Sequence, residues 1–196
     1  MKWESLDIRQ FSSSDYIAAY QHLDDVKRAK VERTRQKKDR LRTVAADALA
    51  RRMLGKAMGC APEAVCFAYS ENGKPTAIGK YELSISHSEN LVVVAIHTGP
   101  VGIDVEHIHE VSPRLAKKYF CADENFYIFG HEPHDVDFEQ IPRDDVRLRF
   151  FEIWTAKEAY LKSIGEGLSH LRTINTTTLP FERHLIENEY LVTIYY

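Results

Sequence analysis

Residues 101–108 read VGIDVEHI, a short apolar segment that contains two acids. Because side chains alternate along a strand, Ile103 and Val105 point to one face while Asp104 and Glu106 point to the other. Two carboxylates this close raise each other's pKa and disfavour folding unless a positive charge lies beside them. The segment therefore predicts a strand that holds a cation on one face, either a metal ion or neighbouring Arg and Lys side chains.

Further strands are predicted before this segment. Leu83 and Ile85 alternate with polar residues, and LVVVAI at 91–96 is the longest apolar run of the chain, so we expect two strands joined by the polar link SHSEN. The turn HTGP at 97–100 then predicts a hairpin between 91–96 and 101–108.

Helices are predicted in both halves of the chain. Apolar residues from Leu41 to Met53 follow a helical period that closes at Gly55 or Gly59, which predicts one long helix with a shorter one before it. The other expected elements are a short helix at 113–120, a mobile surface loop at 130–146, a helix at 147–164, and strands at RTINTTTL (172–179) and YLVTIYY (190–196). Helices precede strands twice, which indicates two similar lobes, 1–100 and 101–196.

The composition limits the class of protein. A chain of 196 residues can bury a core without covalent staples. Three cysteines without CxxC spacing favour reduced thiols over a disulfide framework or zinc ribbon. No apolar run approaches the roughly 20 residues of a membrane helix, and the N-terminus lacks the apolar region of a signal peptide. We therefore expect a cytoplasmic protein with no membrane contact.

The charge distribution points to an anionic ligand. The chain has 26 basic and 29 acidic residues, but the basic ones concentrate between 27 and 52. Such a segment attracts anions or simply forms a solvated helix surface. Nucleic acid is disfavoured as a partner because no aromatic residues interleave the basic segment.

The helix at 147–164 contributes a third acid. Trp154, Glu158, Leu161 and Lys162 fall at i, i+4, i+7 and i+8, so the charged pair shares a face with two apolar side chains. An exposed Glu–Lys pair is the simpler interpretation. The other is that Glu158 joins the two strand acids around one hard cation, for which three carboxylates and water make an oxygen shell typical of Mg²⁺.

Two other segments offer donors to an anion. In LSISHSEN at 83–90, His87 lies where a strand ends, and in ENGKP at 71–75, Lys74 sits in a turn. Local hydrogen bonding and a plain turn are the alternatives. A zinc site is disfavoured because His107 and His109 lack completing ligands.

These motifs together resemble a known family. GKP at 73–75, SISHS at 84–88, GIDVE at 102–106, LAKKYFCADE at 115–124 and WTAKEAYLK at 154–162 stand in the order and spacing found in the 4'-phosphopantetheinyl transferases of the surfactin-synthetase-activating type. The resemblance covers about 27–169. It implies an α+β pseudo-dimer of two similar lobes with coenzyme A in the cleft between them.

The resemblance also implies the reaction and the site. A serine hydroxyl of an apo acyl or peptidyl carrier protein, from fatty-acid, polyketide or nonribosomal peptide biosynthesis, accepts the phosphopantetheine arm, and adenosine 3',5'-bisphosphate leaves. The acids that match Asp104, Glu106 and Glu158 hold Mg²⁺, and Glu158, Lys162 and Asp104 are the catalytic candidates, with Glu158 or a water molecule as the base. The cofactor-binding positions are Lys27, Lys30, Arg42, Lys74, Pro75, Ser86, His87 and Lys162. A monomer is expected.

Two other functions use the same residues. A Mg²⁺-dependent hydrolase of phosphate esters would release nucleotide without a carrier protein. A non-enzymatic protein would bind coenzyme A or an acidic partner regardless of Mg²⁺. Both are distinguished from the transferase by assay of an apo carrier.

Overall fold

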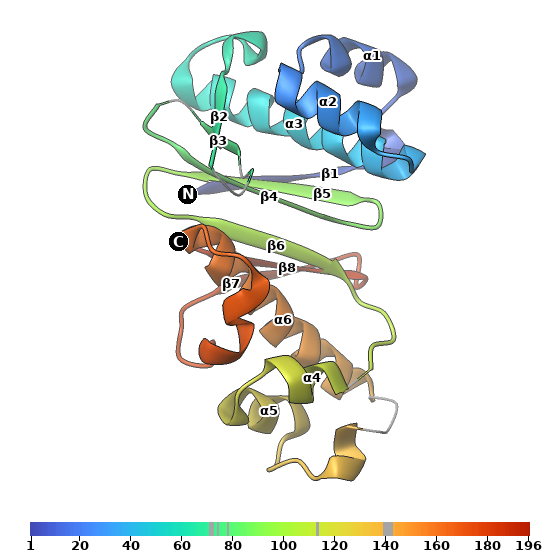
Figure 1. Ribbon diagram of the computed structural model, residues 1–196, viewed down its shortest axis with the longest axis vertical. Helices are drawn as coiled ribbons and strands as arrows, with labels where there is room; N and C mark the ends of the chain where they lie inside the picture. Colours follow the sequence, from blue (N-terminus) through green and yellow to red (C-terminus); the bar gives the residue numbers. More distant parts are fainter. Residues whose placement is uncertain (71–72, 74, 78, 113, 139–142) are drawn as a thin grey trace. The chain divides into compact units, whose positions relative to one another are not determined.

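A computed structural model describes residues 1–70, 73, 75–77, 79–112, 114–138 and 143–196. The chain divides into two compact units, Met1–Val101 (unit 1) and Gly102–Tyr196 (unit 2). Each unit combines helices with an antiparallel sheet, as Figure 1 shows, and the predicted α+β class is confirmed.

Unit 1 is built on a three-stranded sheet in the order β1-β5-β4. Its elements are β1 (Lys2–Asp7), η1 (Ile8–Gln10), α1 (Ser13–Gln21), α2 (Asp25–Arg33), α3 (Lys37–Met58), η2 (Pro62–Ala64), β2 (Phe67–Tyr69), β3 (Pro75–Ala77), β4 (Glu82–Ser88) and β5 (Leu91–His97). Strands β2 and β3 form a separate antiparallel pair. Helix α3 packs on all three strands of the main sheet, and α1 and α2 pack on α3 (Figure 1).

The core of unit 1 lies between β5 and α3. Residues 92–95 of β5 are completely buried, as expected for a central strand with neighbours on both edges. The long helix contributes Ala45, Leu49 and Met53, spaced by four residues, to the same core. It ends at Gly59, whose φ of 73° is the left-handed conformation that glycine adopts without strain.

Unit 2 has a sheet in the order β6-β8-β7. Its elements are β6 (Gly102–His107), α4 (Arg114–Tyr119), α5 (Ala122–Phe129), η3 (Asp135–Phe138), α6 (Asp144–Ile164), η4 (Leu168–Thr173), β7 (Glu182–Ile186) and β8 (Tyr190–Tyr195). Helix α6 lies along β6 and β8, and α5 packs on α6 (Figure 1).

The two units share one topology. In each, the first strand pairs with the last strand, the last strand also pairs with the one before it, and the long helix packs on the sheet. Thus β1, α3, β4 and β5 correspond to β6, α6, β7 and β8. The predicted pair of similar lobes is confirmed.

Three sequence predictions are wrong. Strand β6 pairs with β8, with Asp104 opposite Thr193, and not with β5 as the HTGP turn predicted. The segment 172–179 is no strand, because it holds the end of η4 and a turn. The predicted surface loop contains η3, where Phe138 is buried against the ring of Phe129 at 5.2 Å between centroids.

Helices that span membranes are not found within the described ranges, where none is both long and apolar enough to cross a bilayer.

Candidate functional site

The backbones of β6 and α6 meet at Gly102. A Cβ atom added there would lie 1.7 Å from the carbonyl oxygen of Ala159, so only glycine allows this approach. Because alternate residues share a face, Asp104 and Glu106 lie on the same side of β6 as Gly102, the side that faces α6. The face that the two acids were predicted to share is therefore the face of β6 towards α6.

A second contact holds α6 on the sheet, one helical turn before Ala159. Thr193 lies opposite Asp104 in the strand register, and its hydroxyl lies 2.6 Å from that of Thr155 on α6. Both threonines are fully buried. The helix is thus held on β6 and β8 at two successive turns, next to Glu158.

Lys162 reaches Asp104 directly. Its Nζ donates to Oδ1 of Asp104 at 2.6 Å, and the side chains are 27% and 5% exposed respectively. Because the carboxylate is nearly buried and the ammonium is only partly exposed, water screens the attraction between these charges less than in a surface pair. A basic side chain therefore lies beside the strand acids, as the second interpretation of residues 101–108 predicted.

The charges of both strand acids act on Glu158. Burial raises the pKa of its carboxyl from a usual value of 4.5 to about 7, and the charge of Asp104 adds to this effect. Lys162 acts in the opposite direction, and Glu106 raises the pKa further. The structure therefore brings Asp104, Glu106, Glu158 and Lys162 into one electrostatic cluster, within unit 2.

The donor set of this cluster fits Mg²⁺. Three carboxylates offer hard oxygen ligands. Burial and, to a lesser extent, the charges of Asp104 and Glu106 raise the pKa of Glu158, and a divalent ion would offset both effects. Across the described ranges, no three His, Cys, Asp or Glu side chains are already spaced as a ready-made metal site. The metal proposal thus depends on the chemistry of the three acids.

Lys27 is part of a buried network in unit 1. Its Nζ donates to Asp47 at 2.7 Å, and Arg51 donates to the other oxygen of the same carboxylate at 2.6 Å. The ammonium also lies 4.4 Å from the ring centre of Phe67. Lys27 therefore has an internal structural role, and its predicted contact with the cofactor stays a prediction.

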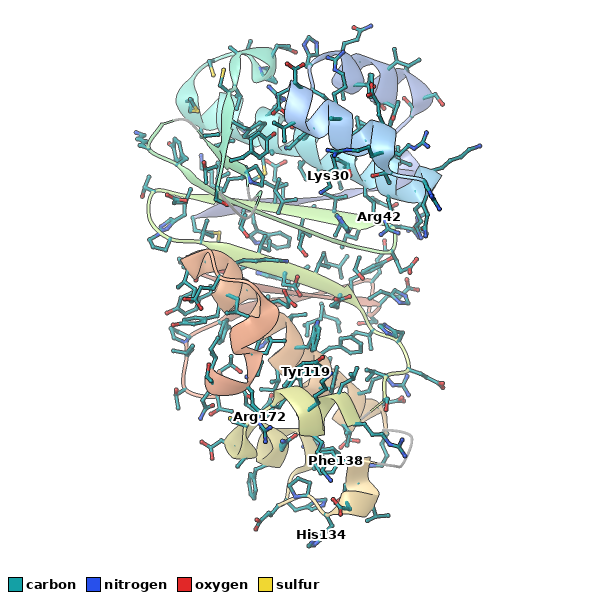
Figure 2. The ribbon with its side chains drawn as sticks, viewed as in Figure 1. Lys30, Arg42, Tyr119, His134, Phe138 and Arg172 are labelled. Carbon is teal, nitrogen blue, oxygen red and sulfur yellow. The ribbon has the colours of Figure 1, made fainter. Side chains whose placement is uncertain are left out.

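Lys30 and Arg42 lie on the neighbouring helices α2 and α3, where Figure 2 labels them. Lys30 is exposed. Arg42 pairs with Asp39 at 3.2 Å, and its Nε is buried with no hydrogen-bond partner among the described residues. A buried donor without an acceptor is costly, so this nitrogen points to an anionic ligand.

Ser86 and His87 are neighbours on β4, so their side chains lie on opposite faces of the strand. Ser86 is buried and His87 is exposed. The ion pair between Lys38 and Glu89, at 2.5 Å, ties the first turn of α3 to the turn after this strand. Pro75 begins β3, whereas Lys74 lies outside the described residues.

One buried charged pair was missed by the sequence analysis. Lys157 and Glu124 form an ion pair at 2.8 Å with no exposure of either side chain. Lys157 is the residue before Glu158, but helical spacing alone predicted no partner for it. The only available signal was that it sits on a helix face flanked by apolar residues.

Comparison with protein families identifies both halves of the chain. Residues 100–192 match the model of the 4'-phosphopantetheinyl transferase superfamily. Residues 10–99 match the model of the N-terminal region of 4'-phosphopantetheinyl transferase.

Curated relatives agree with these matches. The chain is 35% identical over 131 residues to the 4'-phosphopantetheinyl transferase gsp of Aneurinibacillus migulanus, covering 67% of this chain and 51% of the relative. It is 33% identical over 146 residues to psf-1 of Bacillus pumilus, covering 74% and 58%. These matches thus span somewhat more than half the length of the relatives. By both family models together, the chain belongs to the 4'-phosphopantetheinyl transferase superfamily, and its relatives are of the surfactin-activating type.

Proposed function

We propose that the protein transfers the 4'-phosphopantetheine arm of coenzyme A to a serine hydroxyl of an apo acyl or peptidyl carrier protein. Adenosine 3',5'-bisphosphate is the other product, and Mg²⁺ is required. The observation that supports this most is the cluster of Glu158 and Lys162 on α6 with Asp104 and Glu106 on β6. Relatives that carry the name of this activity support the reaction class.

The reaction is a phosphoryl transfer. The serine oxygen forms a bond to the phosphorus that carries the pantetheine arm, and the bond from that phosphorus to the bridging oxygen of the diphosphate breaks. Negative charge develops on the departing bisphosphate. Such reactions are accelerated mainly by positioning and charge neutralisation. Lys162 offsets part of this charge, and Mg²⁺ held by Asp104, Glu106 and Glu158 would neutralise the diphosphate.

The serine proton needs an acceptor. With a pKa of about 7 in the absence of a metal, Glu158 is in the range where a carboxylate takes a proton near neutral pH. A carboxylate that gives all its lone pairs to a metal cannot do so. A water molecule in the same cluster is the alternative acceptor, and the two differ in their dependence on Glu158.

Unit 1 also offers cations for the phosphate groups of coenzyme A. Arg42 is the best supported of these, because its buried Nε has no acceptor among the described residues. We assign Arg42 and the exposed Lys30 to the 3'-phosphate. Ser86, His87, Lys74 and Pro75 are proposed as further contacts of the cofactor.

Mass spectrometry of an apo carrier protein tests the proposal. Incubation with coenzyme A and Mg²⁺ should add the mass of one phosphopantetheine arm to the carrier. Glu158→Gln and Asp104→Ala should each lower the rate by about a hundredfold or more, since each removes a group that stabilises charge. The matched control is Glu152→Gln, the same change on the same helix, at a carboxylate that accepts a bond from Tyr127.

The outcomes separate the candidate functions. Release of nucleotide from coenzyme A without a carrier would favour a hydrolase. Binding of coenzyme A that is indifferent to Mg²⁺, with no product, would favour a non-enzymatic protein. Activity of Glu158→Gln equal to that of the control would contradict the site.

Three further properties are proposed with this function: a preference among carrier proteins, a monomeric state and a cytoplasmic location. The choice of carrier is tested with a panel of apo acyl and peptidyl carriers. A monomeric state is tested by light scattering, and a cytoplasmic location by fractionation of cells that produce the protein.

A further inference from the structure

The Lys157–Glu124 pair of unit 2 has no part in the chemistry proposed above. Both side chains are 0% exposed and lie 2.8 Å apart. Removing two charges from water is expensive, and apolar residues of similar size at such positions often give equal or greater stability. The pair is therefore a poor source of stability, and its contacts indicate another role.

The bonds of Lys157 connect its helix to two other segments. The Nζ of Lys157 donates to Glu124, to the carbonyl of Leu171 and to the carbonyl of Ile174, the last two at 2.5 Å. The ammonium thus uses all three of its N–H donors. Three segments, α5, α6 and 171–174, converge on one nitrogen.

The carboxylate of Glu124 also has hydrogen-bond donors on both of its oxygens. Its Oε1 accepts from the backbone N and the hydroxyl of Thr176, at 2.9 and 2.8 Å. Its Oε2 accepts from the backbone N of Cys121 at 3.0 Å, at the start of α5, as well as from Lys157. With no donor or acceptor left over, the arrangement permits one geometry of these segments and disfavours others.

The position of this anchor on α6 matters for Glu158. Successive residues of an α-helix are about 100° apart around its axis, so Lys157 and Glu158 point in clearly different directions. On the sheet side, Ala159 touches Gly102 and Thr155 bonds to Thr193. On the opposite side, Lys157 is the polar anchor, and it therefore limits rotation and sliding of the helix.

We propose that the Lys157–Glu124 pair is a positioning device that sets the rotation of α6, and so aligns Glu158 and Lys162 with Asp104. This inference rests on the proposed function, since it assigns the pair to that same site. Neither residue touches a reacting group. Both act through the orientation of their helix.

The test replaces both charges at once, because removing one alone would leave the other buried and unpaired. Glu124→Leu/Lys157→Met should keep a thermal midpoint close to or above that of the wild type. Its kcat for carrier modification should fall by about tenfold or more, because misplacement of reacting groups by a fraction of an ångström is costly. The KM for coenzyme A should change little.

The matched control is Ile153→Val, a buried apolar change one turn earlier on the same helix. It should lower stability slightly and leave kcat unchanged. A folded double variant with the kcat of the wild type would overturn the proposal. Should the double variant fail to fold, Glu124→Gln decides, because it keeps the size of the side chain and removes the charge that pairs with Lys157. It should lower kcat, and an unchanged kcat again overturns the proposal.

A second readout needs no activity. A double-mutant cycle of Asp104→Asn and Lys162→Met, followed by urea unfolding, measures the coupling of that ion pair. The coupling should be clear in the wild-type background and smaller in Glu124→Leu/Lys157→Met. Equal coupling in both backgrounds contradicts the positioning role, whether or not the wild type modifies a carrier.

Discussion

Glu158 is a residue held between opposing charges. Burial is the largest cause that raises the pKa of its carboxyl, Asp104 and Glu106 raise it further, and Lys162 lowers it. The ion pair of Lys162 with Asp104 leaves the cluster with more negative than positive groups. At the scale of single residues, the cluster therefore holds one acid whose pKa of about 7 lies near neutral pH.

Stability should depend on pH through Glu158. Its folded pKa of about 7 lies above the usual 4.5, so the folded state binds the proton more tightly than the unfolded chain does. The ionised carboxylate therefore opposes folding above pH 7, and this penalty fades as pH falls from 7 towards 4.5. In EDTA, Glu158→Gln should raise the thermal midpoint at pH 8 by a few degrees (on the order of 2–6 °C) and change it little at pH 5.

Circular dichroism melting at the two pH values checks this expectation. Glu110→Gln, at an exposed position, serves as the control and should have no effect at either pH. An equal shift at pH 5 and pH 8 for Glu158→Gln would show that the carboxylate is not destabilised by its surroundings.

Gly102 should tolerate no side chain. A Cβ at 1.7 Å from the carbonyl oxygen of Ala159 forces α6 away from β6, so Gly102→Ala should cost about 3 kcal/mol of unfolding free energy and should lower transferase activity. Gly99→Ala is the control, because its Cβ would meet His97 at an ordinary 3.5 Å. Urea unfolding gives both values, and similar stability of the two variants would refute the close contact.

At the scale of elements, η3 is more than a surface connection. Phe138 packs on Phe129, Lys117 lies 5.6 Å from the centre of its ring, and the same lysine pairs with Asp135 at 2.6 Å. These contacts dock the segment 135–138 on α4 and on the core of unit 2. Figure 2 labels Phe138 and His134, which lies just before η3.

Phe138→Ala should therefore destabilise the protein by about 3 kcal/mol, the usual range for a large buried aromatic residue. Val136→Ala, in the same segment but 53% exposed, should change stability by less than about 0.5 kcal/mol. Both are measured by urea unfolding. Equal, small effects would mean that the segment is not docked.

Elements with strong periodicity were predictable from sequence. The apolar period of α3 and α6 and the buried runs of β5 and β8 gave the right element types, and motif spacing gave the acids that the structure brings together. The pairing of β6 was not predictable from the HTGP turn, because a turn is a local signal whereas the partner of a strand is set by tertiary packing.

The elements that were not predicted correctly from the sequence have weak or misleading sequence patterns. Strand β1 is an edge strand with no fully buried residue, so it shows little alternation. Helix α1 also buries no residue, and only its capping box of Ser12 and Asp15 marks its start. The β-branched run at 172–179 imitates a strand, but its backbone instead supplies partners to Lys157 and Glu124.

At the scale of the whole molecule, the proposed roles are divided between the units. In the proposed function, the cluster on β6 and α6 takes part in the transfer, whereas Arg42 and Lys30 on α3 and α2 are assigned to phosphate binding. A change in unit 1 is therefore expected to affect binding of coenzyme A, and a change in unit 2 its conversion.

Arg42→Met should raise the KM for coenzyme A by about tenfold, the worth of a charged hydrogen bond, with little change in kcat. The effect should disappear with dephospho-coenzyme A, which lacks the 3'-phosphate. Arg33→Met is the control, because this exposed arginine on α2 bonds only to the carbonyl of Ala29 among described residues. A rise in KM of equal size with both substrates would exclude the 3'-phosphate as the partner.

The shared topology has a consequence for how such a chain can arise. In each unit the opening strand runs beside the closing one, so that Lys2 stands opposite Ile96 and Gly102 opposite Tyr195. A module whose two ends meet can be copied in tandem with a minimal linker. Here residues 98–101 suffice to join the close of one copy to the opening of the next, which is the arrangement expected after duplication and fusion of an ancestral single-module gene.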